Sequence, residues 1–226
     1  MNFTVTRRNL HNGLASVSAS IPSKTTLPVL SNILFEARED GVWMSGTDLD
    51  VAVRVKVPAD IKEPGCLTAP GKKLQEITRE LPEEPVEVAT RGEQIELKCG
   101  RSHFKLNGLP AAEFPSLPEV DFSECWSVTG KDVNRLIHHT VFAVSTEESR
   151  PILNGVLWEL RDASMRMVAT NGHRLARMGV PADSSGAPSA DFIVPPNALQ
   201  QVQRLFKDDD TLEVARSGNH LGFRAD

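Results

Sequence analysis

Tyrosine is absent from the 226-residue sequence, and aromatic residues make up only 5% of it. Proteins that hold single-stranded bases usually stack them on aromatic side chains, so this composition gives little support to a base-stacking platform. The three cysteines, Cys66, Cys99 and Cys125, are scattered and form no Cys-x-x-Cys pair. That pattern argues against a zinc site or a disulfide framework, and it favours a reducing, cytoplasmic setting.

Long apolar runs are missing as well. No run approaches the roughly 18 residues that a membrane span needs, and the N-terminus lacks the basic-then-apolar layout of a signal peptide. The sequence is 40% apolar with a net charge of −5, which is enough apolar content to bury the core of one or two domains. We therefore expect a cytoplasmic protein without membrane contact. The mild acidity, taken alone, argues against nucleic acid as a partner.

The sequence contains an internal repeat at an offset of 123 residues, and its register needs no gap from Phe3 to Asp60. Both the apolar pattern and several polar positions are kept, so we interpret the chain as two copies of one domain. The aligned segments are 3–6 with 126–129, 27–30 with 150–153, 33–36 with 156–159, 57–60 with 180–183 and, at an offset of 125, 70–79 with 195–204.

Each copy is expected to begin with a strand followed by a helix. Thr6 and Thr129 suit helix N-caps, and Asp132 completes a capping-box pattern with Thr129. Valine at every second position of 51–57 predicts a half-buried strand. The pattern predicts an α+β fold in which each copy has two helices packed on antiparallel sheets, with domains at 1–118 and 127–226 and a linker at 119–126. The helices are expected at roughly 7–19, 72–81, 131–142 and 197–207.

The second copy stops opposite Gly100 of the first. It therefore lacks the counterpart of the last strand of the first copy, which would leave a sheet edge unpaired. We expect from this that the chain is truncated.

The four predicted helices are basic, although the whole chain is acidic. They carry nine basic and three acidic residues, a net charge of +6 in a chain of net charge −5. This asymmetry is typical of a surface that faces phosphate groups. Solvated helix faces that simply carry lysine and arginine remain the alternative. Because both helices of both copies share the bias, we favour contacts to the DNA backbone without base readout.

Acidic and histidine pairs offer little support for catalysis. Asp48 and Asp50 could form a paired-carboxylate metal site, but no further acidic or histidine cluster accompanies them. His138 and His139 are adjacent on a helix and should point in different directions, which disfavours a zinc pair. We expect no metal, no cofactor and no catalytic residue.

A tight turn at Asn171-Gly172 should display His173 and Arg174 at the start of a strand. A catalytic histidine needs a nucleophile and an orienting group, and the sequence supplies no motif for either. A hydrolase that pairs His173 with Asp48 or Asp50 is an alternative, but the repeat places Asp48 in the other domain.

Several segments resemble the bacterial beta sliding clamp, the beta subunit of DNA polymerase III, in order and spacing along the whole chain. The segment Ala-Thr-Asn-Gly-His-Arg-Leu-Ala at 169–176 is the most specific. The other segments are 26–32, 46–50, 109–115 and 150–155. The resemblance implies three repeated domains per subunit, with helices lining a ring that two subunits close head to tail around duplex DNA. Topological linkage would hold such a ring in place, which reconciles the mild acidity with DNA as a partner.

The resemblance also implies two sets of site residues. The DNA-contacting set is Lys24, Lys72, Lys73 and Arg150, with Arg7, Arg135, Arg204 and Lys207 as weaker candidates on helix faces. The peptide-binding pocket is formed by Leu153, Thr170, Gly172, His173, Arg174 and Leu175. The sequence departs from the family at Asn171, where an aspartate is usual, at Pro151-Ile152, where some members have aromatic residues, and at Pro196-Asn197, where some have basic ones.

The resemblance implies these partners: double-stranded DNA, the DNA polymerase III alpha subunit, the clamp loader, and other polymerases and repair proteins that carry short linear motifs. A full-length subunit would form a homodimeric ring, whereas this chain alone is expected to be monomeric and to bind peptides weakly. The alternative is a non-ring protein-interaction module built from the same repeat.

Overall fold

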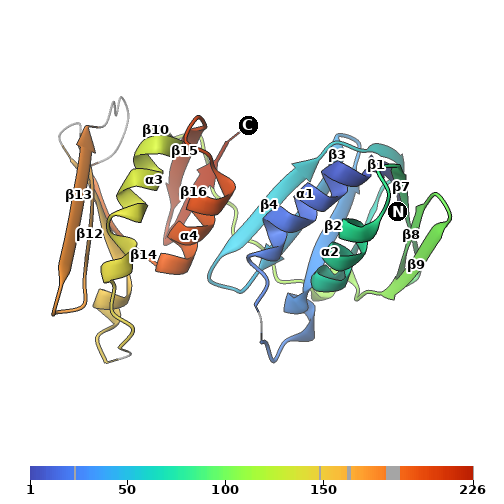
Figure 1. The fold of residues 1–226 in the computed structure, drawn as a ribbon, viewed down its shortest axis with the longest axis horizontal. Helices are drawn as coiled ribbons and strands as arrows, with labels where there is room; N and C mark the ends of the chain where they lie inside the picture. Colours follow the sequence, from blue (N-terminus) through green and yellow to red (C-terminus); the bar gives the residue numbers. More distant parts are fainter. Residues whose placement is uncertain (23, 148, 162–163, 182–188, 226) are drawn as a thin grey trace. The chain divides into compact units, whose positions relative to one another are not determined.

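The computed structural model describes the chain except for residues 23, 148, 162–163, 182–188 and 226. The chain divides into two compact units, Met1–Leu117 and Pro118–Asp226, which we call domain I and domain II (Figure 1). In each of them two helices lie side by side and pack on antiparallel sheets. The predicted α+β fold is confirmed.

Domain I contains a five-stranded sheet of order β5-β1-β7-β8-β9 and a four-stranded sheet of order β4-β3-β2-β6. Helix α1 packs against α2 and against strands of both sheets. The elements are β1 (Asn2–Thr6), α1 (Arg7–Ser18), the 3₁₀ turn η1 (Pro28–Ser31), β2 (Asn32–Arg38), β3 (Gly41–Thr47), β4 (Ala52–Val57), β5 (Asp60–Glu63), β6 (Gly65–Pro70), α2 (Gly71–Glu80), β7 (Pro85–Arg91), β8 (Gln94–Cys99), β9 (Ser102–Asn107) and η2 (Ala111–Glu113).

Domain II repeats this plan. Its described sheets have the orders β10-β15-β16 and β13-β12-β11-β14, which match β1-β7-β8 and β4-β3-β2-β6 of domain I strand for strand. The repeat read from the sequence is thereby confirmed. The elements are β10 (Trp126–Thr129), α3 (Gly130–His138), η3 (Val141–Ala143), η4 (Pro151–Asn154), β11 (Val156–Arg161), β12 (Ser164–Thr170), β13 (Leu175–Pro181), β14 (Ala190–Val194), α4 (Pro196–Leu205), β15 (Thr211–Ser217) and β16 (His220–Arg224).

Local sequence explains where the helices begin. The Thr6 and Thr129 hydroxyls accept hydrogen bonds from the backbone N–H of Asn9 and Asp132, which satisfies one of the free donors at each helix start. The Thr129 hydroxyl also donates to the Asp132 carboxylate at 2.8 Å. The two residues predicted to form a capping box are therefore joined, but the Asp132 carboxylate binds the Thr129 hydroxyl where the box predicts the Thr129 backbone N–H. Helix α4 begins at Pro196, where proline costs no hydrogen bond.

Helix α3 ends earlier than the sequence predicts, at His138 rather than near residue 142. The buried Thr140 hydroxyl donates back to the Leu136 carbonyl at 2.7 Å, and the Thr140 backbone leaves the helical region at φ −131°. Side-chain bonds of this kind compete with the helical ladder. The chain then forms the 3₁₀ turn η3, which packs against β12 and brings Phe142 to the surface.

Each domain has its own apolar core, formed by the inward faces of the sheets and helices. In domain I the core includes Leu14 and Phe35. In domain II it centres on Trp158, which is fully buried and stacks on Phe223 at a centroid distance of 5.8 Å. Full burial of one such side chain stabilises a fold by about 1.5–3 kcal/mol. The two cores leave the helix faces and the strand-to-strand turns exposed as the surfaces on which sites can lie.

The segment expected as a linker contacts domain II. The Arg224 guanidinium lies over the Phe122 ring, 4.3 Å from the ring centroid. The Asp121 backbone N–H donates to the Ser217 hydroxyl at 3.3 Å. Hydrogen bonds from Ser123 lower the pKa of the Asp121 carboxyl below its ordinary value. Within the described part of the chain, no helix is long and apolar enough to cross a membrane.

Candidate functional sites

The turn between β12 and β13 in domain II is fixed by its own hydrogen bonds. The Asn171 side-chain oxygen accepts from the backbone N–H groups of His173 and Arg174, both at 3.0 Å. The Thr170 hydroxyl donates to the Arg174 carbonyl at 2.7 Å and accepts from the Gly172 N–H at 3.1 Å. Gly172 has φ +88°, the left-handed region that favours glycine. The predicted tight turn is confirmed, and His173 and Arg174 are exposed on it.

Domain I contains the same turn between β3 and β4, bond for bond. The Asp48 carboxylate accepts hydrogen bonds from the backbone N–H groups of Asp50 and Val51. The Thr47 hydroxyl donates to the Val51 carbonyl and accepts from the Leu49 backbone N–H. Asp48 thus has the same role as the uncharged Asn171. The bonds of the turn need no ionised carboxylate, which argues for a structural role of Asp48 and against the hydrolase alternative.

Leu49 occupies the position that Gly172 holds in domain II. Its φ is +82°, and it is the one non-glycine residue with positive φ in the described part of the chain. Its side chain is 60% exposed, so packing compensates little for the backbone strain. The two copies therefore share one hydrogen-bonded frame and differ in the side chains that the frame displays.

Apolar side chains are displayed around the turn of domain II. Leu175 follows the turn and is 66% exposed, whereas Leu153 in η4 is half-buried and its carbonyl accepts from the Ser145 N–H. Phe142 in η3 is 57% exposed. The Arg174 guanidinium lies 5.6 Å from the Phe142 ring centroid and donates to the Phe142 carbonyl. The structure thus joins η3 to the turn through Arg174.

Arg150 also lies beside the turn. A Cβ placed on Gly172 would come within 3.3 Å of the Arg150 guanidinium. The Glu147 carboxylate lies 4.0 Å from the Nε atom of the same guanidinium. One residue assigned to DNA and one assigned to the peptide pocket are therefore neighbours in domain II. Ile152, which stands where some family members have an aromatic residue, is 69% exposed.

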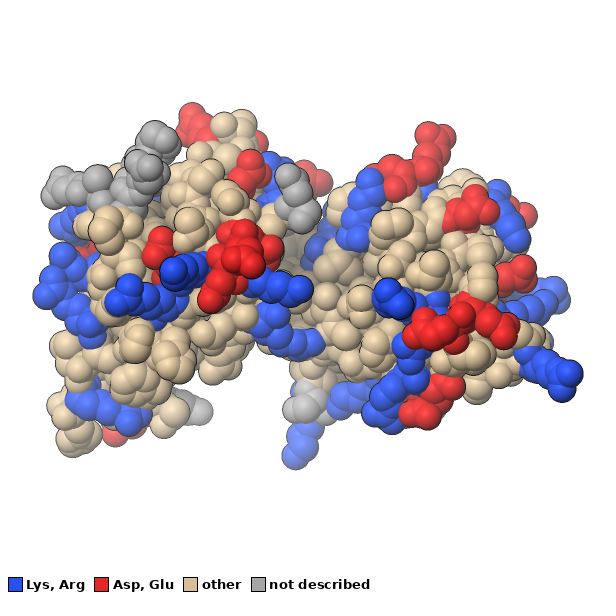
Figure 2. All heavy atoms as spheres, turned by 45° about the horizontal axis from the view of Figure 1, so that its top comes forward, with Lys and Arg blue, Asp and Glu red and all other residues tan. Residues whose placement is uncertain are grey.

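The predicted DNA-contacting residues of the helices are mostly exposed. In α2 these are Lys72 and Lys73, and in α3 and α4 they are Arg135 and Arg204. Lys24 is exposed too and lines a shallow hollow with Leu27 and Leu49. Lys207 lies just beyond α4, where its backbone N–H donates to Asp210. Figure 2 shows acidic and basic side chains intermingled on one face of each domain.

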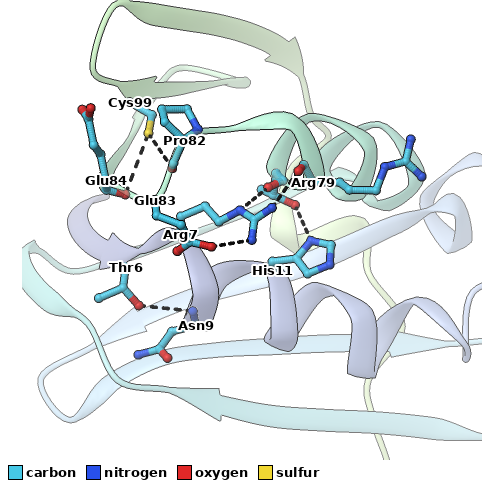
Figure 3. Close-up of polar contacts among 10 residues, drawn as sticks. Thr6, Arg7, Asn9, His11, Arg79, Pro82, Glu83, Glu84 and Cys99 are labelled. Carbon is cyan, nitrogen blue, oxygen red and sulfur yellow. Dashed lines mark hydrogen bonds and ion pairs between the residues drawn. The ribbon is translucent and has the colours of Figure 1, made fainter.

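Arg7 differs from the other basic candidates because its guanidinium is held inside domain I (Figure 3). Its side chain is 19% exposed. Its nitrogens donate to the carbonyls of Thr78 at 2.9 Å and Arg79 at 2.6 Å, and to Glu83 at 2.8 Å. Those carbonyls lie in the last turn of α2, where a cation is favourably placed. Arg7 therefore ties the start of α1 to the end of α2.

Groups suited to catalysis are not assembled in the described structure. Burial, with the nearby Glu84 charge, raises the pKa of the Cys99 thiol, which disfavours a nucleophilic thiolate. The rings of His138 and His139 do meet edge to face at 5.2 Å, so the expectation that they point apart is wrong. Among the described residues, however, no three His, Cys, Asp or Glu side chains are placed to hold a metal ion.

Sequence reasoning missed Phe142 and the strain at Leu49. For Phe142 a signal was present, because the offset of 123 aligns it with Ala19, a large exposed side chain against a small one. For Leu49 the signal was its alignment with Gly172. Neither position stands out in a single copy of the repeat.

Both halves of the chain match one known family. Residues 1–118 match the "DNA polymerase III beta subunit, N-terminal domain" and residues 127–226 match its "central domain". Among curated proteins, the beta sliding clamp of Escherichia coli K12 is 35% identical over 98% of this chain and 61% of its own length. That of Bacillus subtilis is 31% identical over 94% of this chain and 58% of its own length.

Solved structures agree with this match. The Bacillus subtilis DNA polymerase sliding clamp has a TM-score of 0.95 at 29% identity over the whole chain and 62% of its own length. The Pseudomonas aeruginosa clamp, solved bound to griselimycin, has a TM-score of 0.90 at 33% identity over the same shares. The chain spans about three fifths of the length of these relatives, and it belongs to the family of the DNA polymerase III beta subunit, the beta sliding clamp.

Proposed function

We propose that this chain supplies two domains of a sliding clamp, a non-catalytic cytoplasmic protein that encircles duplex DNA and tethers the replicative polymerase. The observation that carries the proposal is the repeat. Two domains with the same strand order each present a pair of helices of net positive charge, +2 for α1 and +1 each for α2, α3 and α4. Repeated domains of one kind suit a closed ring with a uniform inner surface. The alternative of a non-ring interaction module shares the fold but needs no basic bias on the helices.

DNA would be contacted through its backbone. Lys72, Lys73 and Arg135 are exposed on the helices and can approach phosphate groups, as can Lys24 and Arg150 from the loops. Few phosphate contacts mean a small counterion release and hence weak binding that salt reduces further. Weak contacts suit a ring that stays on DNA by topology and must slide along it. Arg7 is the least suited member of the predicted set, because its donors are already engaged within domain I.

Partner proteins would dock at the turn of domain II through short linear motifs. The pocket proposed there combines the apolar side chains of Leu153 and Leu175 with the exposed backbone at Gly172, rimmed by His173 and Arg174. Apolar anchors of a partner peptide would gain by leaving water on such a surface. A solved relative from Caulobacter crescentus, 34% identical, is described with polyethylene glycol bound to its "putative beta-motif tethering region". The DNA polymerase III alpha subunit, the clamp loader, other polymerases and repair proteins are the proposed partners.

Strand β9 is the proposed contact for a second subunit. It ends the five-stranded sheet of domain I, its residues are mostly exposed, and Phe104 on it is 37% exposed. An edge strand with free backbone groups can pair with a strand of another chain. Lys105 on this strand pairs with Glu96 at 3.1 Å, so its charge is already engaged within domain I.

The test compares circular with linear DNA. The full-length protein that contains this chain is placed on a nicked circular plasmid by its clamp loader, and its retention at about 150 mM salt is followed before and after the plasmid is cut. A ring stays on the circle and slides off the free ends. Equal retention on both forms contradicts the proposal and favours the non-ring interaction module.

A further inference from the structure

Helix α3 has an apolar side and a basic side. Its buried residues, spaced three or four positions apart, are Gly130, Val133, Leu136 and Ile137. They define the side that packs on the core of domain II. Four exposed residues on the other side follow the same kind of spacing, and we call them the α3 stripe: Lys131, Arg135, His138 and His139. The two histidines therefore extend by one turn the basic surface that is proposed to face DNA.

The two histidines of the stripe are free to meet a ligand. Their side chains are exposed, and among the described residues neither has a hydrogen-bond or ion-pair partner. Their rings meet edge to face at a centroid distance of 5.2 Å. His11 of helix α1 differs, because its Nδ1 atom lies 3.3 Å from the Thr78 hydroxyl. His138 and His139 can thus present ring N–H donors side by side to a group that approaches from solvent.

The elements that pack on α3 supply no negative charge for these histidines. Those elements are α4, β10, β12, β13 and η3, and within their described ranges they contain no aspartate or glutamate. Their charged residues are Arg204 of α4, Arg166 of β12 and Arg177 of β13. Arg166 is paired with Glu159 of the neighbouring strand β11 at 3.4 Å.

Carboxylates that bond to α3 do so in its first half. Asp132 accepts from the Thr129 hydroxyl, and Asp208 accepts from the Asn134 side chain at 2.9 Å. Beyond η3, the Glu147 carboxylate lies 4.0 Å from the Arg150 guanidinium. An anion that approaches the α3 stripe from solvent would therefore be the counter-charge of the two histidines.

The histidine pair belongs to one copy of the repeat. The offset of 123 pairs His138 and His139 with Ala15 and Ser16 of α1, neither of which can be charged. Without its histidines α3 has a net charge of +1, and one added charge on each histidine raises this to +3. Histidine is the side chain that gains its charge between about pH 8 and pH 5. The positive charge of the α3 stripe therefore depends on pH within that interval.

We propose that His138 and His139 form a phosphate contact for duplex DNA in their protonated form, so that DNA binding takes up protons and tightens as the pH falls. This inference rests on the proposed function, in which the basic helices face DNA, and it adds two residues and a pH dependence to that surface. Two charged rings at this spacing repel each other. A phosphate group that accepts charge-assisted hydrogen bonds from both offsets that repulsion. Because linkage is reciprocal, bound DNA favours protonation as much as protonation favours DNA.

The probe is a short fluorescein-labelled DNA duplex, and its binding to the full-length protein is followed by fluorescence anisotropy at about pH 6 and about pH 8. One added phosphate contact steepens the dependence of log affinity on log salt by about 0.9, which strengthens binding roughly tenfold at about 50 mM salt. We expect the unaltered protein to bind at least about fivefold more tightly at the lower pH, with the steeper salt dependence there.

The double variant His138→Gln/His139→Gln keeps polar side chains that cannot take up a proton. We expect its affinities at the two pH values to agree within about twofold, its salt dependence to be the same at both, and its affinity at about pH 8 to match the unaltered protein. The matched control is His220→Gln, since His220 is an exposed histidine on strand β16. This control should keep the full response to pH.

The histidine contact is overturned if the double variant keeps the response of the unaltered protein to pH, or if His220→Gln loses that response equally. The proposed function is read separately from Lys131→Glu/Arg135→Glu, which reverses the permanent charges of the same stripe and should weaken binding at both pH values. If this variant binds the duplex as tightly as the unaltered protein, then α3 does not face DNA, and the proposed DNA contact is overturned together with this inference.

Discussion

Replacement of Arg7 separates a structural arginine from the residues of the same helices that are proposed to face DNA. Its guanidinium makes two hydrogen bonds to carbonyls of the last turn of α2 and an ion pair with Glu83. A hydrogen bond with a charged partner contributes roughly 1.5–3 kcal/mol. The pair with Glu83, whose side chain is 62% exposed, adds about 0–1 kcal/mol because solvent screens it. With the carbonyls free to bind water once the arginine is gone, we expect Arg7→Ala to lower the stability of domain I by about 3 kcal/mol.

The assay is amide hydrogen exchange across α1 and α2 of the full chain, which reports the free energy of opening of these helices. Arg8→Ala is the matched control, because Arg8 is the next residue of the same helix and is exposed; a surface change of this kind stays within about 0.5 kcal/mol. Arg7→Lys should fall between the two, since an ammonium group cannot reproduce the planar fork. The reasoning is refuted if the free energy of opening of α1 and α2 in Arg7→Ala equals that of the unaltered protein and the only defect of the variant is weaker DNA association.

Four further substitutions test other parts of the fold. Thr129→Ala removes the N-cap of α3 and should cost about 1 kcal/mol, read from exchange of the first amides of that helix. The hydrogen bond from Lys105 leads the causes that hold the pKa of Glu96 below its ordinary 4.5. Stability due to Glu96 is therefore complete above about pH 4.5 and is lost as the pH falls through the lower folded pKa, so Glu96→Gln should flatten acid unfolding as the pH falls below about 4.5. Gly172→Leu should destabilise domain II by about 1 kcal/mol, since left-handed strain of about 1–2 kcal/mol is partly offset by a stiffer unfolded chain. Leu49→Gly should shift domain I by less and in the opposite direction, and thermal shifts of the same sign in both would contradict the comparison.

Much of the fold could be predicted because the sequence repeats itself. Each copy corroborates the other, and local signals such as the Thr6 and Thr129 caps or the alternating valines of 51–57 depend only on neighbours in the chain. Helix ends were harder to predict. Where α3 ends, the Thr140 hydroxyl bonds back to the Leu136 carbonyl, and periodicity has no signal for that bond.

The candidate site was only partly predictable, because exposure and engagement are properties of the folded chain. Composition could show that the helices are basic, but it could not show that the Arg7 donors are taken up by Thr78 and Arg79. Likewise the family resemblance supplied the residues of the turn, whereas the contact between Arg174 and Phe142 joins positions 32 residues apart. This contact depends on where helix α3 ends, because η3 and Phe142 follow directly after it, and no sequence motif encodes that end.

The most direct test of the account is whether the basic helices face DNA. Fluorescence anisotropy with labelled duplex DNA at low salt compares the double variant Lys72→Glu/Lys73→Glu in α2 with Lys98→Glu on β8, all three lysines being exposed. We expect the helix variant to bind at least about tenfold more weakly and the strand variant to stay within about threefold of the unaltered chain. Equal losses in the two variants, or no loss in the helix variant, would contradict the claim that this family member holds DNA against its helices.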